Sequence, residues 1–134
     1  AAQSVGMAQG ALERALKYAK QRQQFGQRLA DFQVIQHKLA DMALDIESAR
    51  LLTYKAAWYV DKGQIIPKLA CMAKTLATTN AVRVISEAMQ IFGGYGYLAD
   101  YDIERYYRDI RVSMIYEGTT EIQKNVVARI LLSE

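Results

Sequence analysis

The sequence predicts an all-α protein, an up-and-down four-helix bundle with an additional short helix. Three observations support this fold class. The 134 residues include one proline and eight glycines, so long stretches lack residues that break helices. Apolar residues recur along these stretches at intervals of three and four, as they do on a helix with one buried face. Alternation with the period of a strand never extends beyond a few residues.

The first two helices are predicted over residues 2–22 and 32–62. Between them, Gly26 lies in the segment QRQQFGQRL, where the first helix is expected to stop. Asp31 is expected to cap the start of the second helix, and Gly63 follows its end as a C-terminal glycine commonly does. The apolar stripe expected on the second helix comprises Phe32, Ile35, Leu39, Met42, Ala43, Ile46 and Ala49.

A third helix is predicted over residues 67–92. Pro67 falls in its first turn, where the missing N–H is not needed. The glycine-rich run 93–97 ends this helix, and a short helix is expected over residues 102–112. We expect these antiparallel helices to pack into one domain that covers residues 1–134.

The last helix follows a loop at residues 113–118. It is predicted to begin at Thr119 or Thr120, since Thr120 and Gln123 have the spacing of a capping box. Glu117 lies in the loop, and two interpretations of it remain open. The helix dipole favours a carboxylate at this position. Alternatively, apolar neighbours make the carboxylate a stronger base, and the next glycine leaves room for a substrate.

Three further segments allow both a functional and a structural interpretation. Residues 22–26, RQQFG, place an arginine beside a glycine, either as a phosphate site or as a solvated helix end. Residues 90–97, QIFGGYGY, either bring backbone close to a ligand or form a tight corner. Residues 95–111 interleave tyrosine with arginine, which suits stacking on nucleic-acid bases, the end of a bundle or a subunit contact.

The composition is that of a globular protein and excludes several classes. With 51% hydrophobic and 23% charged residues, the chain is not intrinsically disordered. One cysteine and one histidine do not supply a structural zinc site, so we expect no metal. A net charge of +3 is too small to indicate a nucleic-acid partner. No apolar run approaches the roughly 20 residues of a membrane span, and no signal peptide is recognisable, so we expect neither a span nor secretion.

The order of the motifs resembles that of the C-terminal domain of the acyl-CoA dehydrogenases. The motifs RQQFG, Gln33, QIFGGYGY, YYRDIR and IYEGTTEIQKNVVAR follow one another with the spacing of that family, over essentially the whole chain. The resemblance implies that an N-terminal helical domain and a middle β-domain are absent here. It also implies FAD as the cofactor and the conversion of an acyl-CoA substrate to the trans-2-enoyl-CoA. An electron-transfer flavoprotein would accept the electrons.

The resemblance also implies roles for individual residues. Glu117 matches the catalytic base, and Tyr116, Gly118 and Arg129 match substrate-binding positions. A glutamate at this position indicates the short- and medium-chain type of the family. The FAD-binding positions of the family match Arg22, Phe25, Gln33, Gln90, Ile91, Phe92, Gly93, Gly94, Thr119, Thr120 and Glu121.

The resemblance further implies a homo-oligomer, a dimer of dimers. Residues 90–94 match a segment that reaches FAD across a subunit interface, so the bundle would form part of that interface. The expected location is the bacterial cytoplasm or the mitochondrial matrix, and the isolated domain is expected to be inactive. Two alternatives are a self-associating helical module without catalysis and a domain of an acyl-CoA oxidase, which uses oxygen as the electron acceptor.

Overall fold

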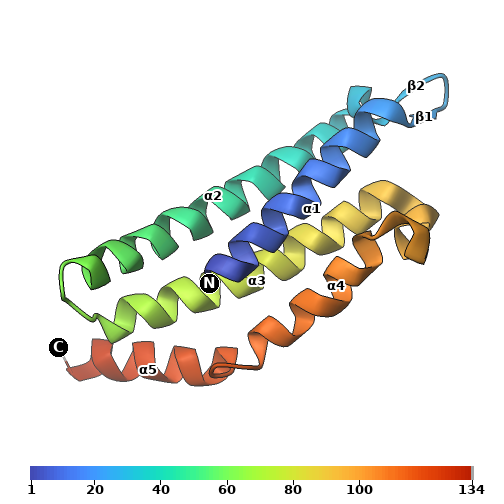
Figure 1. Ribbon diagram of the computed structural model, residues 1–134. Coiled ribbons are helices and arrows are strands. Elements are labelled where there is room, and N and C mark those ends of the chain that lie inside the picture. The colour runs from blue at the N-terminus through green and yellow to red at the C-terminus, as the bar shows by residue number, and fades with distance from the viewer. Residues whose placement is uncertain (134) are drawn as a thin grey trace.

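The computed structural model describes residues 1–133 and is almost entirely helical. Figure 1 shows α1, α2 and α3 side by side, while α4 and α5 follow one another along α3. Helix α3 packs against each of the other four helices. The predicted four-helix bundle with an additional short helix is therefore confirmed. Three of its helices are α1, α2 and α3, and α4 and α5 together occupy the place of the fourth. The helices are α1 Ala2–Gln21, α2 Gln33–Asp61, α3 Pro67–Phe92, α4 Ile103–Arg111 and α5 Thr120–Ser133.

Small side chains let α1 approach its neighbours closely. A row of alanines on α1 has at most 2% of its surface exposed: Ala8, Ala11, Ala15 and Ala19. The distance between packed helices depends on the side chains at the contact, so alanine allows a short one. Larger side chains from three other helices fill the remaining core, and each buried one contributes about 1.5–3 kcal/mol. The bulkiest fully buried ones are Met42, Ile85, Ile103 and Ile110.

Helix α2 is buried along a narrower stripe than the sequence predicts. Met42, Ile46 and Ala49 are buried, but Ala43 is exposed. One residue turns a helix by about 100°, which carries Ala43 away from the contact with α1 and α3. Exposed apolar side chains also lie on α2: Val34, Leu44, Leu51, Tyr54, Trp58 and Val60.

A small hairpin connects α1 to α2, and the sequence did not predict it. Strand β1 (Gln23–Gln24) pairs antiparallel with β2 (Gln27–Arg28). The two residues between them, Phe25 and Gly26, have φ values of 52° and 79°. Positive φ at both central residues is the geometry of the two-residue turn that suits the twist of a hairpin. The expected stop of the first helix in this segment is confirmed, since α1 ends at Gln21.

The signals at the ends of α2 and α3 were predicted with mixed success. Asp31 does not cap α2, because its carboxylate accepts hydrogen bonds of 3.0 and 2.8 Å from the Arg28 guanidinium. The N-cap position of α2 is Phe32, which offers no side-chain cap. The other two signals are confirmed, since Pro67 begins α3 and Gly63 follows α2 with a φ of 73°.

Helix α5 is capped one residue earlier than its capping-box pattern predicts. The Thr119 hydroxyl oxygen accepts a hydrogen bond from the Ile122 N–H at 3.3 Å. Thr120 is buried, and its hydroxyl donates to the Met114 carbonyl at 3.4 Å. The side chain of Gln123 binds the loop that precedes the helix. The predicted capping box between Thr120 and Gln123 is therefore wrong.

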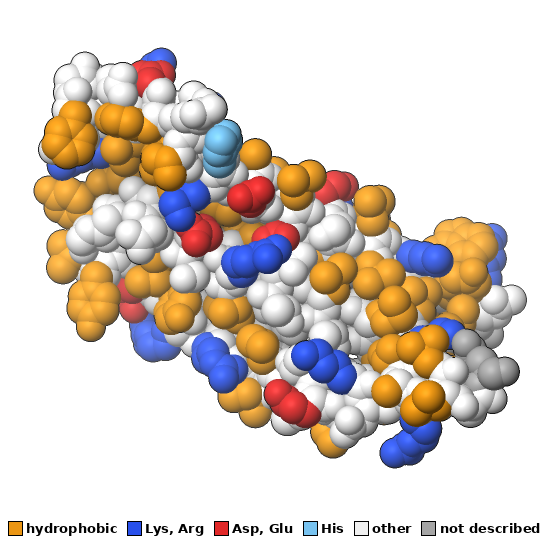
Figure 2. Space-filling model, turned by 180° about the vertical axis from the view of Figure 1, so that it is seen from behind, with side chains coloured by type: hydrophobic (Ala, Val, Ile, Leu, Met, Phe, Trp, Pro, Cys, Tyr) orange, Lys and Arg blue, Asp and Glu red, His pale blue; other side chains and the backbone are white. Residues whose placement is uncertain are grey.

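The surface carries both signs of charge and several apolar areas. Figure 2 shows the face that is hidden in Figure 1, where acidic and basic side chains mix across the middle and hydrophobic ones gather towards the ends. Within residues 1–133, no helix has the length and hydropathy needed to cross a membrane. In the same range, no three acidic, histidine or cysteine side chains come together as metal ligands.

Candidate functional site

The structure divides the predicted site residues between two places. Figure 1 shows that α1 ends, α2 begins and α3 ends at the same end of the bundle. This end, which we call the hairpin end, carries Arg22, Phe25, Gln33 and residues 90–94. The second place is the connection between α4 and α5, with Tyr116, Glu117, Gly118, Thr119, Thr120 and Glu121. Arg129 is exposed further along α5.

Glu117 and Gly118 form a left-handed turn before α5, which we call the Glu117 turn. Their φ values are 52° and 93°. A positive φ costs a residue with a side chain about 1–2 kcal/mol, and such strain clusters at functional sites. Glycine is favoured at position 118 by its positive φ, and a Cβ there would lie 2.4 Å from Gln123 Nε2, so the Gln123 side chain would have to move. The turn therefore fixes the carboxylate-bearing residue in an uncommon backbone conformation.

Side chains from α3 and α5 hold the backbone of the Glu117 turn. Lys74 Nζ on α3 donates a hydrogen bond of 2.6 Å to the Gly118 carbonyl. Gln123 Nε2 on α5 donates to the Glu117 carbonyl at 3.1 Å. Each contact joins a helix of the bundle to the loop, so the position of the turn depends on the packing of the bundle.

The Glu117 turn borders a polar hollow of about 250 Å³. The hollow reaches the start of α1, where the Tyr116 hydroxyl donates to Gln3 Oε1 at 2.6 Å. Glu117 itself is exposed in the loop, as the sequence predicts. An exposed carboxylate at the edge of a polar hollow is able to accept a proton from a molecule seated on this face. The hollow is lined by Ala1, Gln3, Ser4, Lys74, Thr78, Ser113, Tyr116 and Glu117.

Charged groups around the Glu117 turn influence one another. Burial lowers the pKa of Lys74 below its usual range, against the opposing effect of the Glu117 and Glu121 carboxylates. The pKa of Glu121 is also lowered, first by a hydrogen bond from its own backbone N–H and then by the Thr119 side chain. Both hydrogen bonds favour the ionised form of Glu121 at the start of α5, where the helix dipole also favours negative charge.

At the hairpin end, an arginine and a phenylalanine face outward. The Arg22 guanidinium lies over the ring of Tyr95, 5.4 Å from its centroid, and donates to Gln24 Oε1 at 3.4 Å. Phe25 is 86% exposed at the tip of the hairpin. Its ring is therefore accessible to a ligand or to another protein surface.

Residues 90–94 contribute in two different ways. Ile91 and Phe92 are buried at 4% and 7% exposure, so their side chains belong to the core. Gln90, Gly93 and Gly94 are exposed, and nothing lies within 4 Å of a Cβ built at either glycine. A ligand at this end can therefore approach the glycine backbone, while it can meet only the backbone of the two buried residues.

The groups available at the hairpin end suit a ligand with phosphates and a planar ring. Arg22 offers a cation, and Gln33 and Gln90 offer exposed amide groups. Phe25 offers a ring face, and the open glycines allow close approach. Arginine and amide N–H donors bind phosphate oxygens, and an aromatic ring packs against a flat heterocycle. This donor set fits FAD, the cofactor that the sequence resemblance implies.

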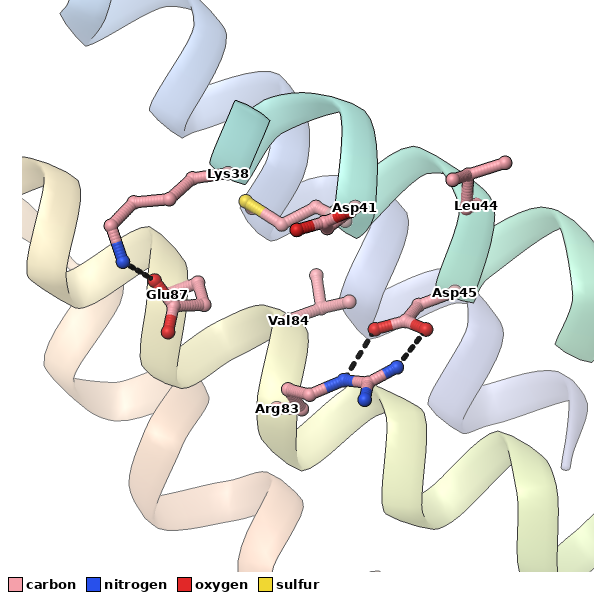
Figure 3. Close-up of a pocket in the computed structure, with 8 residues that line it drawn as sticks. Lys38, Asp41, Leu44, Asp45, Arg83, Val84 and Glu87 are labelled. Atoms are coloured by element: carbon pink, nitrogen blue, oxygen red, sulfur yellow. Dashed lines mark hydrogen bonds and ion pairs between the residues drawn. The ribbon is translucent and has the colours of Figure 1, made fainter. Parts of the chain in front are cut away.

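A second hollow, of about 400 Å³, lies between α2 and α3 and is not a comparable site. In Figure 3 its charged side chains point at one another across the two helices. The Arg83 guanidinium binds both oxygens of Asp45, and Lys38 pairs with Glu87. These charges pair with one another, so they contribute to the contact between the two helices.

Sequence reasoning missed Lys74 as part of the candidate site. The available signal was its place in the helix, since Lys74 lies one residue after buried Ala73 and four before buried Thr78. A lysine so close to a buried face has to direct its ammonium towards a polar partner. The partner is a carbonyl 44 residues away in sequence, which helical periodicity does not reveal.

Comparison with known proteins agrees with the geometry. The family described as "Acyl-CoA dehydrogenase, C-terminal domain" matches residues 1–132. The 3-(aryl)acrylate reductase of Clostridium sporogenes is 52% identical over 132 residues, which are 98% of this chain and 35% of that protein. The caffeyl-CoA reductase-Etf complex subunit CarC of Acetobacterium woodii is 50% identical over 134 residues, 100% of this chain and 35% of that protein.

The fold is also that of a solved enzyme. The structure of butyryl-CoA dehydrogenase from Megasphaera elsdenii matches with a TM-score of 0.96 and 49% sequence identity. The match covers 98% of this chain and 34% of that one. The chain thus spans about a third of the length of the proteins that it resembles.

Proposed function

The chain belongs to the acyl-CoA dehydrogenase family, and we propose that it is the C-terminal domain of an FAD-dependent enzyme that acts on acyl-CoA thioesters. The proposed reaction removes one hydrogen from the α-carbon and one from the β-carbon, giving the trans-2-enoyl-CoA. The observation that carries the proposal is the Glu117 turn, an exposed carboxylate on a strained backbone tied to two helices. The rest of the substrate pocket would come from the parts of the enzyme outside this chain.

In this proposal Glu117 is the base that takes the α-proton. The α-proton of a thioester is weakly acidic, so its removal requires a carboxylate held close to the carbon. The backbone contacts of the turn limit its movement before a substrate arrives. Gly118 leaves space beside the carboxylate, and Tyr116 borders the same hollow. Arg129 is further along α5 and would contact a more distant part of the substrate.

FAD, when bound, supplies the redox step by accepting the β-hydrogen as hydride. Arg22, Gln33 and Gln90 would hold its phosphates and polar groups, and Phe25 would pack on a ring. The residues of the α5 start, Thr119 to Glu121, lie apart from this group. We infer that the enzyme is a homo-oligomer. In such an assembly, the hairpin end and the start of α5 of one subunit could contact the flavins of two different subunits.

The reverse reaction is a second candidate. Two of the relatives are named as reductases, one for 3-(aryl)acrylate and one in an Etf complex with caffeyl-CoA. In the reverse direction Glu117 would return a proton to the α-carbon as hydride reaches the β-carbon, so the same residue serves both directions. The name of the CarC relative also supports an electron-transfer flavoprotein as the redox partner.

The compared relatives are bacterial, which supports the bacterial cytoplasm, one of the two expected locations.

The test uses the full-length flavoenzyme that contains this chain. Butyryl-CoA is added without oxygen while the flavin absorbance is recorded. We expect the flavin to be reduced and crotonyl-CoA to form. Failure to reduce the flavin, with rapid reoxidation of dithionite-reduced enzyme by an aryl-acrylyl-CoA, would favour the reductase instead. Rapid reoxidation by oxygen after butyryl-CoA would favour the oxidase alternative. An enzyme that binds no flavin and is unaffected by either thioester would contradict the proposal.

A further inference from the structure

Lys74 connects the middle of the bundle to the Glu117 turn. It lies on α3 and lines the polar hollow below the turn, together with Thr78 and Ser113. Its ammonium donates to the Gly118 carbonyl at 2.6 Å, a short bond for a charged donor. The residue that bears the candidate base is directly before this anchored glycine.

The carbonyl that Lys74 binds belongs to a glycine, the residue type with the greatest backbone freedom. Glycine at 118 has a φ of 93° and no side chain to limit its rotation. Gln123 Nε2 reaches the same carbonyl only at 3.5 Å. Lys74 thus supplies the short contact that fixes the orientation of this peptide group. Its loss would leave the Glu117 turn free to rotate at the glycine.

The same ammonium carries a positive charge that faces two carboxylates. The charged groups around Lys74 are Glu117 in the turn and Glu121 in the first turn of α5. Burial lowers the pKa of Lys74, whereas the two carboxylates raise it. A half-buried charge is screened less by solvent than an exposed one.

We propose that Lys74 is the positioning residue of the Glu117 turn, anchoring the Gly118 carbonyl and holding a positive charge beside the Glu117 carboxylate. The hydrogen bond sets where the base lies, and the ammonium places a cation near the carboxylate before substrate binds. This inference rests on the proposed function of Glu117 as the base.

The experiment compares four variants of the full-length flavoenzyme with wild type. Lys74→Met removes both the donor and the charge, while Lys74→Arg keeps the charge and can still donate to a carbonyl. Lys38→Met is the matched control, because Lys38 also joins two helices through an ion pair but lies in the hollow of Figure 3. Glu117→Gln tests the proposed base separately. For each, the rate of flavin reduction by butyryl-CoA is measured at the same pH.

We expect Lys74→Met to slow flavin reduction by about tenfold to a hundredfold, since a small misplacement of a reacting group has an effect of this size. Lys74→Arg should recover most of the lost rate, because arginine can still donate a hydrogen bond to the Gly118 carbonyl. Lys38→Met should keep the wild-type rate.

Two results would overturn the inference. One is a Lys74→Met enzyme that reduces its flavin at the wild-type rate. The other is an equal loss of rate in Lys74→Met and Lys38→Met, or no recovery in Lys74→Arg, which would mean general loosening of the bundle. If Glu117→Gln reduces its flavin at the wild-type rate, the proposed function fails, whatever the Lys74 variants show.

Discussion

The ring of Tyr18 on α1 stacks on the ring of Phe92 at the end of α3, with centroids 4.2 Å apart and planes at 17°. Tyr101 meets both rings close to edge-on, at 6.3 and 6.0 Å. Because Gly93 comes directly after Phe92, this aromatic cluster fixes the direction in which the glycine-rich segment leaves α3. The core and the candidate cofactor segment therefore depend on the same side chain.

The first prediction concerns that shared side chain. Phe92→Ala should lower the free energy of unfolding by about 3–5 kcal/mol, because a buried aromatic ring is replaced by a cavity. Tyr97→Ala, in the same segment but 83% exposed, should change it by no more than about 0.5 kcal/mol. Urea denaturation followed by circular dichroism measures both. Equal losses in the two variants would show that the stacking does not stabilise the bundle.

The second prediction concerns the backbone of the Glu117 turn. Gly118→Ala should destabilise the protein by about 1–2 kcal/mol, because alanine disfavours the positive φ at this position. Gly6→Ala is the matched control, since Gly6 lies inside α1 with open space around it and should gain about 0.5–1 kcal/mol. Thermal denaturation gives the two changes. A neutral Gly118→Ala would mean that the turn is not held in the left-handed conformation.

The third prediction concerns the exposed ring of the hairpin. Phe25→Ala should leave the melting temperature unchanged, because the side chain makes little contact with the bundle. It should reduce the FAD content of the purified full-length enzyme, if the ring packs against the cofactor. Leu132→Ala removes an equally exposed apolar side chain on α5, 89% exposed, and should leave the flavin bound. Full flavin occupancy in the Phe25 variant would remove this residue from the cofactor site.

The fourth prediction is a dependence of stability on pH at the start of α5. The pKa of Glu121 is lower in the folded protein than in the unfolded chain, where it is about 4.3. The unfolded chain therefore binds more protons near this pH, and the stabilisation is present above it and is lost as the pH falls through the lower, folded value. Glu121→Gln should flatten this acid dependence in urea denaturation at several pH values. An unchanged slope between pH 6 and pH 3 would contradict the prediction.

The helices of the bundle could be predicted because their signals are local. Pro67 and Gly63 act through their own backbone preferences, and apolar side chains three and four residues apart define a face without knowledge of the neighbours. The extended segment around Phe25 was missed because a two-residue hairpin leaves almost no periodic pattern. Asp31 was misassigned because two partners compete for its carboxylate, the N–H groups at the start of α2 and the Arg28 guanidinium. The sequence does not decide which of the two it binds.

The candidate site could be predicted only in part, for a similar reason. The exposure of Glu117 follows from its place in a loop, so the sequence was sufficient. The burial of Ile91 and Phe92 follows from packing against α1, which a motif does not reveal. The contact between Lys74 and Gly118 joins two distant segments, and only the assembled bundle brings them together.

The most direct test of the central claim is the anaerobic reduction of flavin in Glu117→Gln, made in the full-length enzyme and mixed with butyryl-CoA. Glutamine keeps the size of the side chain but cannot accept the α-proton. Glu13→Gln, an exposed change on α1, serves as the control. We predict that Glu117→Gln retains its flavin and reduces it at least about a thousandfold more slowly than wild type, within the range that a lost catalytic base produces. Reduction at the wild-type rate would show that the base lies elsewhere in the enzyme.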